Sequence, residues 1–147
     1  MNARVARLRE RLTEKSYDAI LVSQAENRRY LSGFTGSAGF LLITGSEALL
    51  LTDFRYTEQA GLQAPFFKVQ QVRYAWDSWL PDLARELQVR RLAFDANHVT
   101  FATYQAMIKA LQEKETNVEL APDEQTVELL RAIKEPEEVA AIERAQR

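Results

Sequence analysis

Hydrophobic and polar side chains alternate along this chain with two periods, which predict a succession of helices and strands. Val5, Leu8 and Leu12 are three and four positions apart, so residues 3–15 are expected to form an amphipathic helix. The same pattern, or a capping residue, predicts further helices over residues 24–32, 54–62, 77–87, 101–114 and 123–134. Short apolar runs predict strands over residues 17–23, 40–44, 48–53, 67–72, 91–95 and 118–122.

Capping residues predict where several of these helices begin and end. Ser23 and Glu26 are spaced as a capping box for the second helix, and Gly33 is expected to end that helix. Asp53 and Thr100 are expected to be the N-caps of the helices that follow them.

The second and third strands are expected to form a β-hairpin about Gly45 and Ser46. Both arms are nearly continuous apolar runs, which predicts that both faces of the hairpin are covered. Strands that alternate with helices favour an α/β fold. The expected architecture is three-layered, with a mixed sheet of roughly six strands flanked by helices.

Composition then narrows the classes of function. The chain of 147 residues has a net charge of −2, so no basic field draws it to nucleic acid or anionic lipid. It contains no cysteine, which is compatible with a reducing cytoplasm and excludes thiolate nucleophiles and cysteine-ligated zinc. No apolar run approaches the roughly 20 residues of a membrane span. We therefore expect a cytoplasmic protein without nucleic-acid or membrane partners.

One short loop concentrates the glycines of the chain. Gly33, Gly36 and Gly39 fall within seven positions, directly before an apolar strand. The simplest interpretation is a tight turn. The alternative is a loop that lies against an anion, a substrate or a second protein surface, because glycine lets the backbone approach closely.

The C-terminal residues predict one more helix. Pro136 stands at the first position of an amphipathic segment that carries Val139, Ile142 and Ala145. We expect this segment to be the beginning of a following domain. The alternative is a C-terminal helix that docks on the sheet of its own domain.

Two stretches closely resemble a known family. Residues 27–60, which include NRRYLSGFTGSAGFLLIT and ALLLTDFRYTEQA, resemble the N-terminal, creatinase-like domain of Xaa-Pro aminopeptidases and prolidases. Residues 129–145, LLRAIKEPEEVAAIERA, resemble the hinge into the catalytic, pita-bread domain of that family. Phe54 departs from the pattern, because many relatives have glycine between the Asp and the Arg of TDFRY.

The resemblance implies a fold and a division into domains. It implies a ribonuclease H-like, creatinase-type α/β domain over residues 1–131. Residues 132–147 would be the hinge and first helix of a C-terminal catalytic domain that this chain does not contain. In the family that domain holds two divalent cations, commonly Mn²⁺, Co²⁺ or Zn²⁺, which activate hydroxide for hydrolysis of the bond preceding proline.

The resemblance also implies a role for the present chain. In relatives the N-terminal domain mediates dimer contacts, and its loops limit substrate length at the neighbouring subunit's active site. We therefore expect a homodimer that acts on proline-containing peptides, with no catalytic residue and no metal ligand in these 147 residues. His98, in a loop after a strand, is expected to be a surface or capping residue. The isolated chain is expected to be inactive.

Six residues are the candidates for substrate contact: Phe34, Thr35, Gly36, Ser37, Arg55 and Tyr56. Phe34 is expected either to face a proline ring or to pack under the hairpin. Ser37 either offers its hydroxyl to substrate or bonds within its own turn. Arg55 either meets a substrate carboxylate or pairs with Glu58, three residues on. Tyr56 is expected to lie in the core.

The role of one aromatic group and two alternatives to the peptidase role stay open. Tyr74, Trp76 and Trp79 either mark an interface or cover the sheet. One alternative function is a ribonuclease H-like, two-metal nuclease, because Asp53 and Asp95 both follow predicted strands. Two-metal phosphoryl transfer, however, needs three or four clustered carboxylates. A stand-alone dimerisation module is a third possibility.

Overall fold

The structure is a computed structural model that describes residues 2–133. The helix predicted to begin at Pro136 therefore lies outside the described residues. The helices are α1 (Ala3–Glu14), α2 (Ala25–Ser32), α3 (Thr57–Gln63), α4 (Leu80–Glu86), α5 (Phe101–Glu113) and α6 (Thr126–Ala132), with a short 3₁₀ turn at Trp76–Ser78. The strands are β1 (Ala19–Val22), β2 (Phe40–Thr44), β3 (Ala48–Thr52), β4 (Lys68–Gln71), β5 (Arg91–Asp95) and β6 (Glu119–Asp123).

The six strands form one mixed sheet in the order β4-β3-β2-β1-β5-β6, which confirms the predicted fold class. Strand β2 is antiparallel to both β1 and β3, while β1 with β5, β5 with β6 and β3 with β4 are parallel pairs. Only β2 therefore runs against the other strands of the described sheet. The carboxyl ends of the five others meet at one edge, which we call the carboxyl edge.

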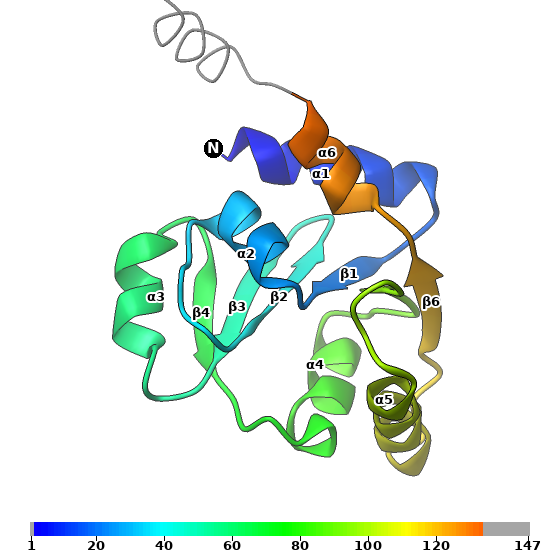
Figure 1. The fold of residues 1–147 in the computed structure, drawn as a ribbon. Coiled ribbons are helices and arrows are strands. Elements are labelled where there is room, and N and C mark those ends of the chain that lie inside the picture. Colours follow the sequence, from blue (N-terminus) through cyan, green and yellow to red (C-terminus); the bar gives the residue numbers. More distant parts are fainter. Residues whose placement is uncertain (1, 134–147) are drawn as a thin grey trace, which may run out of the picture.

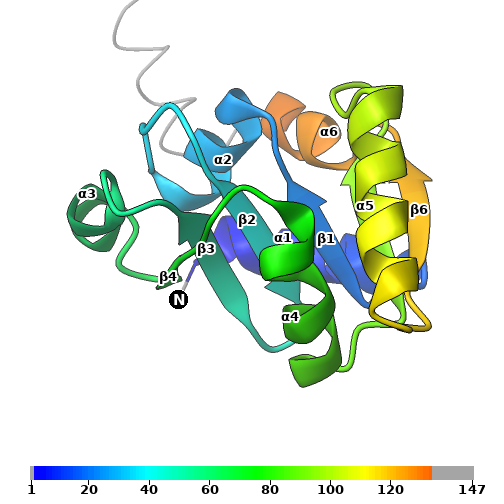
Figure 2. The same ribbon diagram turned by 90° about the horizontal axis from the view of Figure 1, so that it is seen from below.

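Apolar side chains cover both faces of the sheet. On one face, α1, α2, α3 and α6 enclose a core to which alternate residues such as Ile20, Leu41 and Leu50 belong. On the other, α4 and α5 pack over Leu21 and Leu42. Figures 1 and 2 show α1 and α6 on one side of the sheet and α4 and α5 on the other. Burial on two faces explains why the hairpin arms are continuous apolar runs.

Two predicted helix caps have the geometry that the sequence indicated. Gly33 ends α2 with φ of 84°, in the left-handed region. The hydroxyl of Thr100 accepts a hydrogen bond from the amide of Thr103 at the start of α5.

The other two predicted caps are wrong. Ser23 does not cap α2, whose N-cap is Gln24, because its hydroxyl is hydrogen-bonded to His98. Asp53 does not cap α3, which begins only at Thr57, because its carboxylate instead closes a turn on the amide of Arg55. In both cases another partner has taken the side-chain oxygen that the cap required.

Candidate functional site

The loop of residues 33–39 lies at the carboxyl edge, and packing within the domain accounts for its three glycines. A β-carbon at Gly36 would lie 2.1 Å from Cζ of Phe34. At Gly39, φ is 150° and a β-carbon would lie 3.1 Å from the carbonyl oxygen of Leu51. Gly33 ends α2 in the left-handed region. Each of the three glycines therefore allows either a left-handed backbone or a close approach of a neighbouring group to the backbone.

The ring of Phe34 packs beneath this loop. Its side chain is only 1% exposed and belongs to the core that includes Leu31. The ring makes an edge-to-face contact with Tyr56, with 6.1 Å between the centroids. Of the two interpretations of Phe34, the structure has the one in which the ring is packed in the core, where it lies against Gly36 of its own loop and against Tyr56.

Polar contacts fix the outer part of the loop. The amide of Thr35 donates to Oε1 of Gln63, 2.9 Å away, and Nε2 of Gln63 donates to the hydroxyl of Thr35. The exposed hydroxyl of Ser37 lies 2.6 Å from the hydroxyl of Tyr56, rather than bonding within its own turn. The hydroxyl of Thr52 donates to the carbonyl oxygen of Ala38.

A buried arginine that the sequence patterns did not single out holds the loop from within. Arg28 is 5% exposed, and its guanidinium donates to the carbonyl oxygens of Ser23 at 2.5 Å and Gly36 at 3.3 Å. Burial lowers the pKa of Arg28, because desolvation disfavours the charged form. Within residues 2–133 no carboxylate forms an ion pair with it. In the sequence, Arg28 looks like an ordinary surface residue of a helix, so only the fold reveals that it supports the loop.

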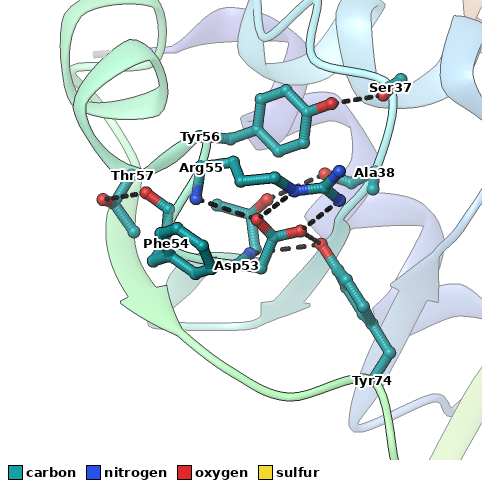
Figure 3. A network of polar contacts seen from close by, with 9 residues as sticks. Ser37, Ala38, Asp53, Phe54, Arg55, Tyr56, Thr57 and Tyr74 are labelled. Carbon is teal, nitrogen blue, oxygen red and sulfur yellow. Dashed lines mark hydrogen bonds and ion pairs between the residues drawn. The ribbon is translucent and has the colours of Figure 1, made fainter.

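Asp53, Arg55 and Tyr74 form a polar network beside the loop (Figure 3). One carboxylate oxygen of Asp53 accepts from the amide and from Nε of Arg55, and the other accepts from Nη2, each at 2.9 Å. The hydroxyl of Tyr74 also donates to Asp53. Arg55 therefore pairs with Asp53 and not with Glu58.

This network perturbs the charged groups in it. Hydrogen bonds from Arg55 and then Tyr74 hold the pKa of Asp53 well below its usual range. The bond to Asp53 raises the pKa of Arg55, and burial together with Asp53 raises that of Tyr74. The carboxylate and the guanidinium are thus both kept charged.

Arg55 keeps one side of its guanidinium available. Its side chain is 58% exposed, and Nη1 makes no hydrogen bond to residues 2–133. The guanidinium carbon lies 5.1 Å from the centre of the Tyr56 ring. Asp53 and Tyr56 therefore hold a planar cation in place, and its second terminal nitrogen can donate to an incoming carboxylate.

The six candidate residues thus divide into two groups. Phe34, Ser37, Arg55 and Tyr56 are brought together around the Tyr56 ring, which is half-buried. Thr35 and Gly36 lie in the same loop, but the side chain of Thr35 contacts α3 and Gly36 lies against Phe34.

Aromatic side chains continue from this network along the carboxyl edge. Tyr74 and Trp76 contact Phe40, with ring centres 6.3 Å and 5.0 Å away. Trp79 is buried and covers the sheet, which is one of the two interpretations open for this group. Tyr74 is 40% exposed.

The described residues do not fit a metal centre. No three His, Cys, Asp or Glu side chains of residues 2–133 are grouped so that they could hold an ion. Asp53 follows β3 and Asp95 ends β5, and β2 and β1 lie between these two strands in the sheet, so the described residues lack the carboxylate cluster that the nuclease alternative needs. His98 is an exposed residue hydrogen-bonded to Ser23. None of the described helices is both long and apolar enough to span a bilayer.

Fold and site together define a three-layer α/β domain that gathers a loop, an anchored arginine and aromatic rings at one edge of its sheet. The family model of the creatinase/prolidase N-terminal domain matches residues 4–133. This chain therefore belongs to the creatinase/prolidase N-terminal domain family, as the sequence resemblance indicated.

Individual relatives agree with this assignment. The uncharacterized peptidase YqhT of Bacillus subtilis (strain 168) is 34% identical over 142 residues, which are 97% of this chain and 39% of YqhT. The solved N-terminal domain of the cytoplasmic peptidase PepQ from Mycobacterium tuberculosis H37Rv is 39% identical, with a TM-score of 0.81 over 89% of this chain and 100% of that one. The Xaa-Pro dipeptidase from Bacillus anthracis is 34% identical, with a TM-score of 0.84 over 94% of this chain and 38% of that one. The chain thus spans about two-fifths of the length of YqhT and of the dipeptidase.

Proposed function

We propose that this chain is the N-terminal, non-catalytic domain of a cytoplasmic, metal-dependent peptidase that hydrolyses Xaa-Pro bonds. Membership of the family supports this, as does the similarity to a protein described as an Xaa-Pro dipeptidase. In this proposal the metals and the hydrolysis belong to another part of the enzyme, which is consistent with the absence of a metal-holding group among residues 2–133. The 147-residue chain alone should therefore not cleave an Xaa-Pro dipeptide.

Within a homodimer of that enzyme, the role of this domain is to contact the substrate bound at the neighbouring subunit's active site. The observation that carries this proposal is the geometry of Arg55. A guanidinium fixed by Asp53 and exposed through Nη1 is organised before any ligand arrives, which reduces the entropy lost on binding a carboxylate.

The loop of residues 33–39 would lie over the same peptide. The hydroxyl of Ser37 and the ring of Tyr56 are next to Arg55 and offer polar and aromatic contacts. Phe34 would act from beneath, because its buried ring supports Tyr56 and fills the space under Gly36. Such a loop would limit the length of peptide that fits.

The test mixes two kinds of subunit of the full-length enzyme. One subunit carries Arg55→Ala and keeps an intact active site. The other subunit keeps Arg55, but its active site is inactivated by the loss of one metal ligand. The Arg55→Ala homodimer should lose at least about tenfold in kcat/KM, because a charge-assisted hydrogen bond is absent. The mixed dimer should regain near-normal turnover at its one intact site, since the partner supplies Arg55.

Turnover in the mixed dimer no better than in the Arg55→Ala homodimer would refute the contact across subunits. The wild-type homodimer, assayed with Xaa-Pro peptides and peptides without proline, tests the reaction class separately. Arg90→Ala is the matched control: Arg90 is an exposed arginine before β5, at the opposite edge of the sheet, and its loss should leave kcat/KM unchanged.

A further inference from the structure

A second feature of the carboxyl edge is a cavity of about 360 Å³ between the ends of β1 and β5 and the beginning of α5. Phe40, Trp76 and Val99 contribute apolar walls, and Ser23, His98 and Thr100 contribute polar groups. In α/β sheets, ligands commonly bind outside the carboxyl ends of the strands, where the strand order changes direction. In this sheet the order changes direction at β1, because β2, β3 and β4 follow on one side of it and β5 and β6 on the other.

Ser23 and His98 determine which hydrogen-bonding group faces a ligand. Ser23 is 8% exposed, and its hydroxyl lies 2.8 Å from Nδ1 of His98, the only side-chain hydrogen bond that this hydroxyl makes within residues 2–133. The Ser23 hydroxyl can donate to Nδ1 or accept from it, depending on the tautomer of the ring. In the tautomer in which Ser23 donates, the neutral ring carries its hydrogen on Nε2. No acceptor for Nε2 occurs among the described residues. In that tautomer the exposed ring of His98 presents the Nε2 hydrogen as an unused donor.

The remaining lining favours an apolar ligand with an acidic group. The rings of Phe40 and Trp76 are 5.0 Å apart and are only half-buried, so a flat or branched apolar body can cover them. None of the described residues that line the cavity is acidic. Thr100 is the N-cap of the 13-residue helix α5. The partial positive charge at the start of a helix favours an anion, as does a hydrogen-bond donor on His98.

We propose that this cavity binds a small carboxylic acid with an aromatic or branched apolar body. The carboxylate accepts a hydrogen bond from Nε2 of His98, and the apolar body lies against Trp76 and Phe40. Both a free hydrophobic acid and the C-terminal residue of a peptide have this chemistry. This ligand site goes beyond the substrate contacts proposed for Arg55.

The experiment titrates the ¹⁵N-labelled 147-residue chain with three probes: 3-phenylpropionate, 3-phenylpropionamide and N-acetyl-Ala-Phe. The indole NH signal of Trp76 should shift with both acids, and the amide should bind at least about fivefold more weakly than 3-phenylpropionate. Tighter binding of N-acetyl-Ala-Phe assigns the cavity to a peptide C-terminus, and tighter binding of 3-phenylpropionate assigns it to a free acid. Equal binding of acid and amide would overturn the proposed carboxylate contact.

Variants separate this cavity from other surfaces. His98→Ala and Trp76→Ala should each weaken 3-phenylpropionate binding at least about fivefold, while His98→Gln, which can keep a side-chain donor, should weaken it less. Arg90→Gln removes an exposed cation at the opposite edge and should change the affinity less than twofold. The amide spectrum of each variant verifies its fold. Unchanged affinity in both His98 variants, or shifts that do not include Trp76, would refute the site.

Discussion

Replacing Gly36 by alanine tests whether the loop is shaped by the ring beneath it. The new β-carbon would lie 2.1 Å from Cζ and 2.7 Å from Cε1 of Phe34, so the ring must move by more than about 1 Å to reach ordinary contact. The ring is 1% exposed and rests against Tyr56, which leaves it little room. Overpacking of this kind costs about 1–3 kcal/mol.

A second contribution has the opposite sign. Gly36 does not have a positive φ, so alanine is allowed there and stabilises by about 0.4–1 kcal/mol through the unfolded chain. We expect Gly36→Ala to lower the free energy of unfolding by about 1 kcal/mol net, within a range of about 0–2.6 kcal/mol. Gly61→Ala is the matched control, because Gly61 lies within α3 with open space around it, and should stabilise by about 0.5–1 kcal/mol.

A double-mutant cycle identifies the cause. Phe34→Ala alone should cost about 3–5 kcal/mol, the range for truncating a buried Phe. In the double variant the clash is absent, so its cost should be less than the sum of the single costs by about 1–3 kcal/mol. Urea unfolding followed by circular dichroism gives the free energies of unfolding of the wild type and the three variants, provided that the m-values agree. Additive costs would refute the reasoning, because they would mean that Phe34 and Gly36 do not constrain each other.

Two further predictions concern the charged groups that hold the site. Because the folded pKa of Asp53 is depressed, its contact with Arg55 should be fully present above pH ~3.9 and disappear only as the pH falls through the lower folded value. The ¹³C shift of the Asp53 carboxyl measures this; a midpoint near 3.9 in the wild type would contradict it, and Arg55→Ala should move the midpoint towards 3.9. Arg28→Met removes the donors to the carbonyl oxygens of Ser23 and Gly36, so it should cost about 1–3 kcal/mol and speed amide exchange in the loop. Exchange in the loop as slow as in the wild type would show that Arg28 does not hold it.

The sequence by itself determined the elements and the class of fold. Strand β5 and the hairpin of β2 and β3 lie almost where the apolar runs predicted them, since a strand buried on both faces must be apolar throughout. Gly33 and Thr100 end and begin their helices as expected, because each acts on backbone groups within a few residues. The family, too, could be identified from short stretches of sequence.

Only the tertiary structure decided which partner each polar or aromatic side chain of the site has. Ser23 bonds to His98, 75 positions away, and Tyr74 reaches Asp53 from 21 positions away. Phe34 became part of the core, and Arg28 became a buried support of the loop. The physical reason is that five parallel strands bring their carboxyl ends to one edge, where residues distant in sequence compete with local caps for the same hydrogen bonds. The periodicity of apolar residues indicates which face of an element is buried. It does not show which residue at the end of another strand will become the hydrogen-bond partner of a given side chain.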